Sequence, residues 1–327
     1  MTRELKNIEA SVKRRLYNLA NKEKLNFDFV LLLFMQERLL YRLSISKYNR
    51  KFILKGGLLI LAATNFKTRP TRDIDFLAQN VNNDSENVKK IFQEICKIEV
   101  KDGVVLDSKS ITVKKIIEAG DYEGVRIKLN SYLGNSRKLL QLDIGFGDVI
   151  VPNSIVLDYP VLLDFDVPKI NVYSFESVIA EKFEAMIRIS LTTSRMKDFY
   201  DIYLLSDIKS FDGEVLQKAI LSTLQRRETP LEKKHVLFTE EFARDNGRIK
   251  MWNGYIKKIG KELIDFDIVM DRLRIFLLPI YEKILKREEF FKKWDNNKGR
   301  LRKRKLNYRK IGCAWIQVAN TTLHFGN

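Results

Sequence analysis

The stretches FILKGG (residues 52–57) and TRDIDF (residues 71–76) decide the fold of this chain. The first is an apolar run that ends in two glycines and leads into the apolar, helical segment Leu58–Ala63. The second continues as an apolar strand, so Asp73 and Asp75 point to the same face. Two adjacent carboxylates repel unless a cation lies between them, and substrate phosphates usually complete an oxygen-rich Mg²⁺ site. The ordered combination predicts a metal–nucleotide site.

The two glycines provide a turn whose backbone can approach a phosphate closely, and the N–H groups of the following helix point at the same anion. Each part has a plainer interpretation, since a D-x-D pair is commonly a solvated loop and a glycine pair is commonly a simple turn. The order of a glycine turn, a helix and then a D-x-D pair on an apolar strand is far more specific than either motif alone. The residues assigned here to nucleotide binding are Lys55, Gly56, Gly57, Thr71 and Arg72.

The composition of the chain limits the classes of protein to which it can belong. The 327 residues can hold two domains, and 45% hydrophobic with 11% aromatic content is typical of a globular chain. The net charge of +17 favours polyanionic partners, nucleic acid first and an acidic protein second, although a solvated lysine-rich surface gives the same charge. The distant Cys96 and Cys313 form no metal or redox motif. No apolar run is long enough to span a bilayer and the charged N-terminus carries no signal peptide, so we expect a cytoplasmic protein without a membrane partner.

Hydrophobic periodicity divides the chain into elements. The predicted helices of the first half are 5–48, with a second helix at 27–43, then 58–63 and 84–97. The predicted strands are 104–106, 111–117, 125–132 and 139–144. Three prolines mark a loop-rich junction, and the predicted helices after it are 174–190, 196–206, 213–224, 239–259 and 267–290. This order favours an α/β (α+β) fold in which helices flank a mixed sheet, followed by a mostly helical C-terminal domain.

The predicted domains are N-terminal helices over residues 1–50, a core over 51–165, a helical domain over 166–290 and a basic tail over 291–327 that can be disordered. The tail contains the run GRLRKRKLNYRK at 299–310. Such runs are usually solvated, and an RNA-binding arm is the other interpretation.

A third carboxylate, Asp143, lies between apolar residues on the predicted strand 139–144. A buried charge there is costly unless it is paired or bound to a metal. If this strand neighbours the strand of Asp73 and Asp75, three carboxylates converge as metal ligands. Two metal ions could then support an in-line displacement, with Asp143 helping to deprotonate or orient the attacking hydroxyl. The alternative is a strand-end aspartate that faces water.

In the C-terminal half, several charged residues fall on the apolar faces of predicted helices. Lys182 falls inside the apolar stripe of its predicted helix, so it either extends outward or meets an anion such as a triphosphate. Arg188 could add a second cation. Asp198 and Asp201 lie on the apolar side of the next helix and need a partner, for which Lys182, Arg188 and Arg195 are candidates. A structural ion pair between the two helices is the alternative.

Together these motifs resemble the AbiEii/AbiGii toxin family of nucleotidyltransferases, which belongs to the polymerase-β-like nucleotidyltransferase superfamily. The likeness runs from about residue 5 to about residue 290. The segments that carry it are 12–20, 37–44, 52–57, Arg69 with 71–75, 142–145, 180–186 and 197–203.

The resemblance implies a nucleotidyltransferase fold and a type IV toxin of a bacterial toxin–antitoxin or abortive-infection phage-defence pair. Such enzymes move a nucleoside monophosphate from an NTP to an acceptor, in studied relatives the 3′ end of tRNA, with Mg²⁺ or Mn²⁺ and with a cognate antitoxin as partner. By position, Asp73 and Asp75 would bind metal, Lys182 would contact the triphosphate, and Asp198 would be the carboxylate of the last motif. Gly57 stands where many superfamily members have serine, which leaves only backbone contacts to the phosphate there.

The predicted catalytic residues are therefore Asp73, Asp75, Asp143, Lys182 and Asp198. The predicted metal ligands are Asp73, Asp75 and Asp143, and Lys182, Arg188 and Asp201 join the nucleotide-binding set. Two other functions stay open at this point, namely transfer of the nucleotide to a protein side chain and a nucleic-acid-binding module without activity.

Overall fold

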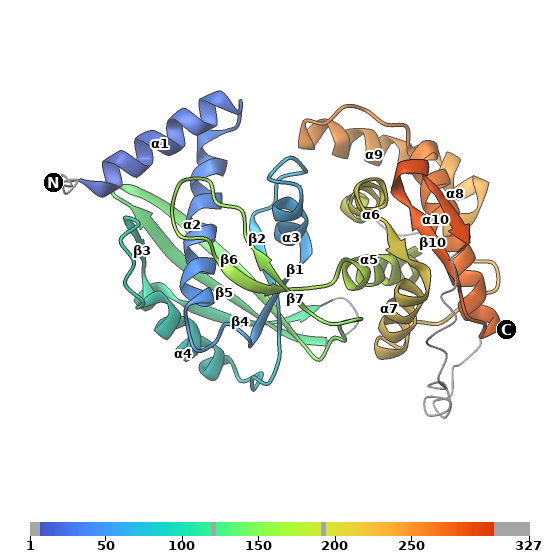
Figure 1. Cartoon of the computed structure of the whole chain (residues 1–327), viewed down its shortest axis with the longest axis horizontal. Helices are drawn as coiled ribbons and strands as arrows, with labels where there is room; N and C mark the ends of the chain where they lie inside the picture. The colour runs from blue at the N-terminus through green and yellow to red at the C-terminus, as the bar shows by residue number, and fades with distance from the viewer. Residues whose placement is uncertain (1–6, 119–121, 191–193, 304–327) are drawn as a thin grey trace. The chain divides into compact units, whose positions relative to one another are not determined.

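The computed structural model describes residues 7–118, 122–190 and 194–303. The chain divides into two compact units (Figure 1). The first comprises Met1–Asp148 and Ser154–Tyr173, and the second comprises Val149–Asn153 and Ser174–Asn327. Cys313 and most of the predicted basic run 299–310 lie outside the described residues.

An eight-stranded mixed sheet forms the first unit. Its strand order is β3-β5-β6-β2-β1-β8-β7, and β4 pairs with β5 beside β3. The pairs β2–β6 and β1–β8 are parallel and the other pairs are antiparallel. The strands are β1 (Phe52–Lys55), β2 (Asp73–Ala78), β3 (Val104–Leu106), β4 (Thr112–Glu118), β5 (Tyr122–Leu133), β6 (Ser136–Phe146), β7 (Ile155–Asp158) and β8 (Lys169–Val172). This arrangement confirms the predicted mixed sheet with flanking helices.

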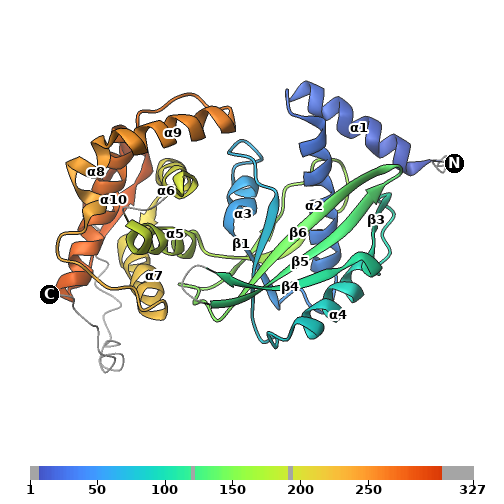
Figure 2. The ribbon, with the colours of Figure 1, turned by 180° about the vertical axis from the view of Figure 1, so that it is seen from behind.

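Strict alternation along β5 and β6 gives the sheet one buried face. The apolar side chains of β5 at 125, 127 and 129 are buried, whereas the polar residues between them are partly exposed. Two helices cover the buried face, α2 (Phe27–Ser44) and α4 (Ser85–Cys96), and α4 places Phe92 5.0 Å from the ring of Phe52 on β1. Figure 2 shows β4, β5 and β6 from the opposite side, which carries no described helix of this unit. One face of these strands is therefore a core and the other is a surface.

Two further helices complete the first unit. The first, α1 (Ile8–Lys22), packs against α2. The second, α3 (Gly56–Ala63), follows β1 directly and packs on β2. Apolar helical periodicity predicted all four helices of this unit, with α1 and α2 separated by the N-cap residue Asn26, whose side chain accepts a hydrogen bond from the N–H of Phe29.

Helix α2 contains buried polar residues that hold two distant segments. The amide nitrogen of Gln36 donates to the carbonyl of Arg72 at 2.6 Å, directly before the strand that carries the paired aspartates. Glu37 accepts from the N–H of Leu162 at 2.7 Å and pairs with Arg38 at 2.8 Å. Arg38 in turn donates to the carbonyl of Asp166. Because these groups are buried, the bonds fix the loop between β7 and β8 and the start of β2 to one helix.

The buried carboxyl of Glu37 is expected to make the stability of the folded protein depend on pH. Burial raises the pKa of its carboxyl from 4.5 to about 7, which the neighbouring Arg38 only partly offsets. Between these two values the folded state holds a proton that the unfolded state has lost, so stability falls as pH rises from about 4.5 to 7, by up to ~3 kcal/mol. Glu37→Gln keeps an acceptor for Leu162 but cannot titrate. We expect it to flatten this part of the pH profile of the free energy of unfolding, measured by urea titration at several pH values, and an unchanged slope would contradict the assignment.

Helices dominate the second unit, as predicted. They are α5 (Phe175–Ile189), α6 (Met196–Ile208), α7 (Gly213–Arg226), α8 (Glu240–Arg244), α9 (Asn246–Ile259) and α10 (Phe266–Lys286). A small antiparallel sheet joins β9 (Phe211–Asp212), β10 (Lys292–Asp295) and β11 (Arg300–Lys303). Two of these strands lie in the segment predicted as a basic tail.

Three predicted elements differ from the structure. The single helix predicted over 239–259 is two helices, because Asp245 ends α8 and its carboxylate accepts from the N–H of Arg248 as the N-cap of α9. The helix predicted to reach residue 290 ends at Lys286, since Arg287 adopts a left-handed conformation. The proline-marked passage predicted as loop contains the short strands β7 and β8.

None of the helices in the described part of the chain is both long and apolar enough to cross a membrane.

Candidate active site

A row of four charged residues crosses four neighbouring strands of the first unit. Lys55 on β1 is in register with Asp75 on β2, Asp75 with Asp143 on β6, and Asp143 with Arg126 on β5. Residues in register share a face, so the row presents its charges in the order positive, negative, negative, positive. Asp73 lies two residues before Asp75 and projects from the same face. The row therefore gathers the three predicted carboxylates on one surface of the sheet.

The glycine turn lies against Asp75. Gly56 has a φ of +67°, and a Cβ at this position would lie 2.0 Å from a carboxylate oxygen of Asp75. A Cβ at Gly57 would lie 2.9 Å from the hydroxyl of Thr71 and 3.1 Å from the guanidinium of Arg69. Both glycines are thus required by close packing, and the turn at the start of α3 stands beside the carboxylates as the sequence predicts.

Gly56→Ala is expected to damage the site through the backbone. Left-handed φ costs a residue with a Cβ about 1–2 kcal/mol, and the clash must also displace the Asp75 carboxylate. We expect a loss of about 1–3 kcal/mol in the free energy of unfolding, measured by chemical denaturation. The matched control is Gly254→Ala within α9, where a Cβ meets nothing within 4 Å. That variant should be neutral or stabilising by up to about 1 kcal/mol, and equal losses in the two variants would contradict this account.

Asp143 is held by a two-bond pair with Arg126. The guanidinium donates to both carboxylate oxygens, at 2.8 and 2.7 Å. The Arg126 side chain is 37% exposed and the Asp143 side chain is 15% exposed, so the pair lies at the open surface of the sheet. This bidentate pair fixes the orientation of the Asp143 carboxylate. Sequence reasoning missed Arg126, because its nearness to Asp143 depends on the register of the β5–β6 hairpin.

Lys55 also has a partner that the sequence did not reveal. Its ammonium lies 2.9 Å from a carboxylate oxygen of Asp148, and both side chains are nearly buried. The ring of Tyr173 lies 5.5 Å from the same ammonium. Lys55 is thus held at one end of the row, and its predicted role in nucleotide binding stays a prediction.

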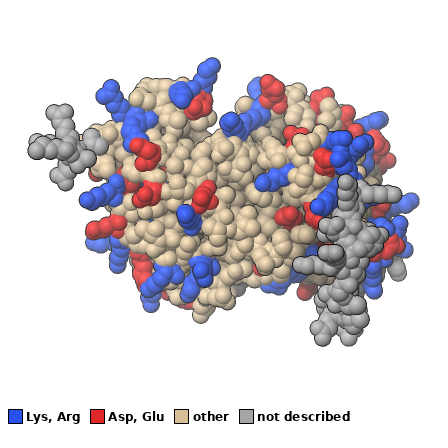
Figure 3. Space-filling view, in the orientation of Figure 1, with Lys and Arg blue, Asp and Glu red and all other residues tan. Residues whose placement is uncertain are grey.

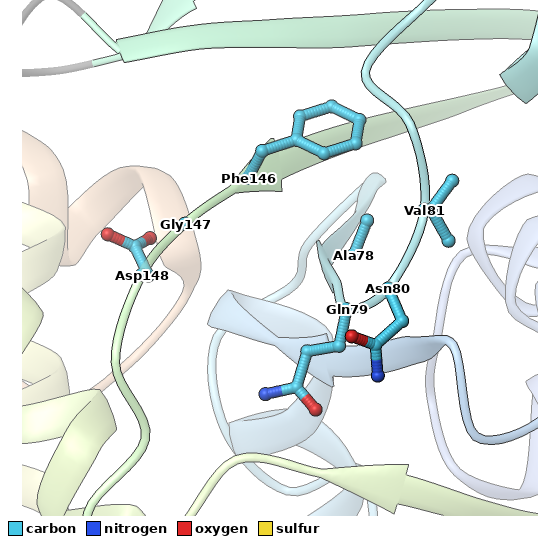
Figure 4. Close-up of a pocket in the computed structure, with 7 residues that line it drawn as sticks. All are labelled: Ala78, Gln79, Asn80, Val81, Phe146, Gly147 and Asp148. Atoms are coloured by element: carbon cyan, nitrogen blue, oxygen red, sulfur yellow. The ribbon is translucent and has the colours of Figure 1, made fainter.

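The ends of the parallel strands β2 and β6 enclose a shallow hollow of about 380 Å³. Figure 4 shows its lining, which comes from the two segments that follow these strands, Ala78–Val81 and Phe146–Asp148. Asp148 belongs both to this lining and to the pair with Lys55. The predicted site residues are not part of the lining, so the hollow lies beyond the charged row rather than within it.

Thr71 and Arg72 precede β2 directly. The hydroxyl of Thr71 faces Gly57, as the spacing above shows, and the carbonyl of Arg72 is the group that Gln36 holds. The two residues therefore connect the glycine turn and helix α2 to the aspartate strand. Their predicted contacts with a nucleotide stay predictions.

A buried ionic cluster occupies the second unit. The ammonium of Lys182 on α5 lies 3.0 Å from Asp198 and 2.7 Å from Asp201, both on α6, and both carboxylates are fully buried. Arg195 donates to the other oxygen of Asp198 at 2.5 Å. Burial opposes the charge on Asp198, but Lys182 and Arg195 outweigh it and lower the pKa of its carboxyl from 3.8 to about 2. The interhelical ion pair left open by the sequence is present, and a contact of Lys182 with nucleotide stays a prediction.

Arg188, the third candidate partner for these aspartates, pairs elsewhere. Its guanidinium lies 2.9 Å from Glu184, one turn earlier on α5. Glu184 is fully buried and also accepts from Arg227 and Thr229. The sequence contained the signal, because glutamate four residues before arginine is a favourable helical spacing.

Two carboxylates of the charged row have the chemistry of ligands for a divalent cation. Asp73 and Asp75 offer oxygen ligands of the kind that Mg²⁺ and Mn²⁺ take, on one face of one strand. Asp143 stands beside Asp75 but is engaged by Arg126. Within residues 7–118, 122–190 and 194–303, no three His, Cys, Asp or Glu side chains are grouped so as to hold a metal ion. Asp73 and Asp75 therefore fit a divalent cation whose coordination is completed from outside the chain, and the predicted metal contact of Asp143 stays a prediction.

Comparison with known proteins gives a family and a set of distant structures. The sequence model described as nucleotidyl transferase AbiEii toxin, type IV TA system, matches residues 38–272. No protein of curated function matches the chain. A candidate nucleotidyltransferase from H. pylori is 15% identical, covering 81% of this chain and 100% of its own, with a TM-score of 0.48.

Two other solved structures have a similarly low sequence identity to this chain. JHP933 from Helicobacter pylori is 14% identical over 80% of this chain and 95% of its own, with a TM-score of 0.46. The antibiotic-resistance factor ANT(2'')-Ia is 15% identical over 58% of this chain and 92% of its own, with a TM-score of 0.33. The sequence match over residues 38–272 is the finding that assigns a family.

Proposed function

Because the chain belongs to the AbiEii family of nucleotidyltransferase toxins of type IV toxin–antitoxin systems, we propose that it transfers a nucleoside monophosphate from an NTP to the 3′ end of an RNA, with tRNA as the first candidate. The observation that carries this proposal is the row of charges beside the glycine turn. Family membership argues against the alternative of a nucleic-acid-binding module without enzymatic activity. The net charge of +17 supports a polyanionic acceptor over a protein side chain.

Each part of the row has a role in this proposal. Asp73 and Asp75 would hold Mg²⁺ or Mn²⁺, which when bound neutralises phosphate charge and polarises the phosphorus centre. The backbone of Gly56 and Gly57 and the N-terminus of α3 would bind the phosphates. Asp143, oriented by Arg126, would accept the proton of the acceptor hydroxyl as the hydroxyl oxygen attacks. That oxygen forms a bond to the α-phosphorus, the bond from the α-phosphorus to the bridging oxygen breaks, and pyrophosphate leaves.

The second unit contributes the remaining predicted residues. Lys182 would meet the triphosphate as a point charge, with Asp198 and Asp201 holding its ammonium in place. Arg188 would add positive charge from the same helix. The division into residues 1–50, 51–165, 166–290 and 291–327 stays part of the proposal, as do a cytoplasmic location, an antitoxin partner and a role in phage defence.

The test is a transfer assay with each labelled NTP in turn, Mg²⁺ and total tRNA. Label in RNA supports the proposal. Label in protein would show a side-chain acceptor instead, and no label in either fraction with any NTP would refute transfer under both versions. The variant Asp75→Asn shows whether the label depends on this site.

A further inference from the structure

The face of β4, β5 and β6 that lies opposite α2 and α4 carries a strip of basic residues. This strip starts at the charged row. Along β5, alternate residues project from this face, and they are Arg126, Lys128, Asn130 and Tyr132. Neighbouring strands extend the strip, since Lys114 on β4 is in register with Arg126 and Arg137 on β6 is in register with Tyr132. We call Lys114, Lys128, Asn130, Tyr132 and Arg137 the basic face.

The basic face is accessible. Lys114 and Arg137 are exposed, and Lys128 and Tyr132 are half-buried. The same strands bury the apolar side chains between these residues against α2 and α4, so the core fixes which residues project from the basic face. Figure 2 shows β4, β5 and β6 in front, without a described helix of their unit over them.

Within the described part of the chain, no acidic side chain forms an ion pair with the cations of the basic face. Lys114 and Lys128 take part in none of the ion pairs among the described residues. Arg137 donates to the side-chain oxygen of Asn130 at 3.0 Å, which is a neutral partner. The face seen in Figure 3, on the other side of the sheet, has basic and acidic side chains interspersed. Like charges gathered on one strip raise the local concentration of a polyanion.

The length and composition of the strip favour a single-stranded nucleic acid. From residue 126 to residue 132 a strand extends about 20 Å, which spans several nucleotides of an extended chain at roughly 3.4 Å or more each. Cations along a groove and an aromatic ring on which a base can stack are the two components of single-strand binding. Tyr132 supplies the ring at the far end, and Arg126 joins the strip to Asp143 at the near end.

We propose that the basic face binds the single-stranded 3′ segment of the acceptor RNA, with its phosphates on Lys114, Lys128 and Arg137 and a base on Tyr132. The terminal hydroxyl then points along β5 and β6 toward Asp143. This inference rests on the proposed function, because it names the surface that delivers the acceptor.

The test measures binding without catalysis. The full chain, without NTP, is titrated against a 5′-fluorescein single-stranded RNA of about ten nucleotides, and anisotropy gives the dissociation constant at several salt concentrations. The charge variant is Lys114→Glu with Lys128→Glu and Arg137→Glu. The matched control is Lys90→Glu with Lys97→Glu and Lys101→Glu, three exposed lysines on and beside α4, which covers the opposite face. Thermal melting confirms that both variants are folded.

The charge variant should bind at least tenfold more weakly than the control, and its slope of log affinity against log salt should be smaller by about 2, since each single-strand phosphate contact contributes about 0.7. Tyr132→Leu should weaken binding about tenfold, whereas Tyr132→Phe should keep it, because stacking needs only the ring. Equal affinities of the charge variant and the control would overturn the proposal. So would tighter binding of poly-glutamate than of RNA, which would indicate an acidic protein partner.

The binding assay separates this inference from the proposed function. If the wild-type chain binds RNA through the basic face but transfers no label to any RNA, the proposed transfer fails while the surface assignment holds. If the wild-type chain labels RNA but the basic-face variants bind as tightly as the control, the transfer holds and the surface assignment fails.

Discussion

Asp75→Asn is expected to reduce nucleotide transfer by at least about a thousandfold, which corresponds to ~4 kcal/mol of transition-state stabilisation. Asp75 occupies the centre of the charged row, between Lys55 and Asp143, and directly beneath Gly56. Asparagine has the same shape but no charge, so the variant removes one of the two carboxylates that fit a cation. The fold should survive, because the substitution also relieves the repulsion between neighbouring carboxylates.

Three measurements check this expectation. Initial rates of label incorporation give the loss of transfer, and thermal melting reports the fold. The shift of the melting temperature on addition of Mg²⁺ or Mn²⁺ reports cation binding without any reaction, and it should disappear in the variant. Asp158→Asn is the control, since Asp158 is an exposed acidic residue on β7 of the same sheet; it should keep transfer within about twofold. Transfer by Asp75→Asn within tenfold of the wild type would show that the row is not the active site.

Lys182→Met is expected to destabilise the protein by about 3–5 kcal/mol, because it leaves Asp198 and Asp201 buried with one cation fewer. The effect should depend on pH. In the wild type the depressed pKa of Asp198 contributes stability above about 3.8 that is lost as pH falls toward 2. In the variant Asp198 loses the ammonium that helps to lower its pKa and can protonate more readily, so the difference in unfolding free energy between variant and wild type should narrow from pH 7 to pH 4.

The control for this variant is a lysine in a surface ion pair. Lys218 lies 2.7 Å from Glu214 on α7 and is 43% exposed. Lys218→Met should cost under about 1 kcal/mol, as exposed pairs do. Urea unfolding at pH 7 and pH 4 compares the two. If Lys182→Met were no more destabilising than Lys218→Met, the buried ionic cluster would not be a source of stability for the second unit.

Local patterns in the sequence predicted much of the first unit. The period-two alternation over 125–132 and 139–144 is strong because one face of each strand is buried, and the structure has β5 and β6 there. The glycine pair and the two aspartates were recognisable because turn and strand are set by residues close in sequence. The strand of Asp143 was only conditionally placed beside that of Asp75, and the register of β2 with β6 now puts these residues side by side.

Contacts between residues that are far apart in the chain could not be predicted from the sequence. Arg126 meets Asp143 only because a hairpin aligns them, and Asp148 meets Lys55 only after β6 has ended. The strands β7 and β8 have four residues each, too few to show a period between prolines. Asp245 is a common N-cap residue, but the apolar period on both sides of it favoured one uninterrupted helix.

The contact of Gly56 with Asp75 has a consequence for how such a toxin loses its activity during evolution. A single nucleotide change can silence the site either by removing the aspartate or by adding a methyl group to the glycine that lies against it. The second route leaves both aspartates intact in the gene. A relative that retains the D-x-D pair but has a side chain at position 56 is therefore expected to have a displaced carboxylate at the position of Asp75, which inspection of the acidic motif alone would not detect.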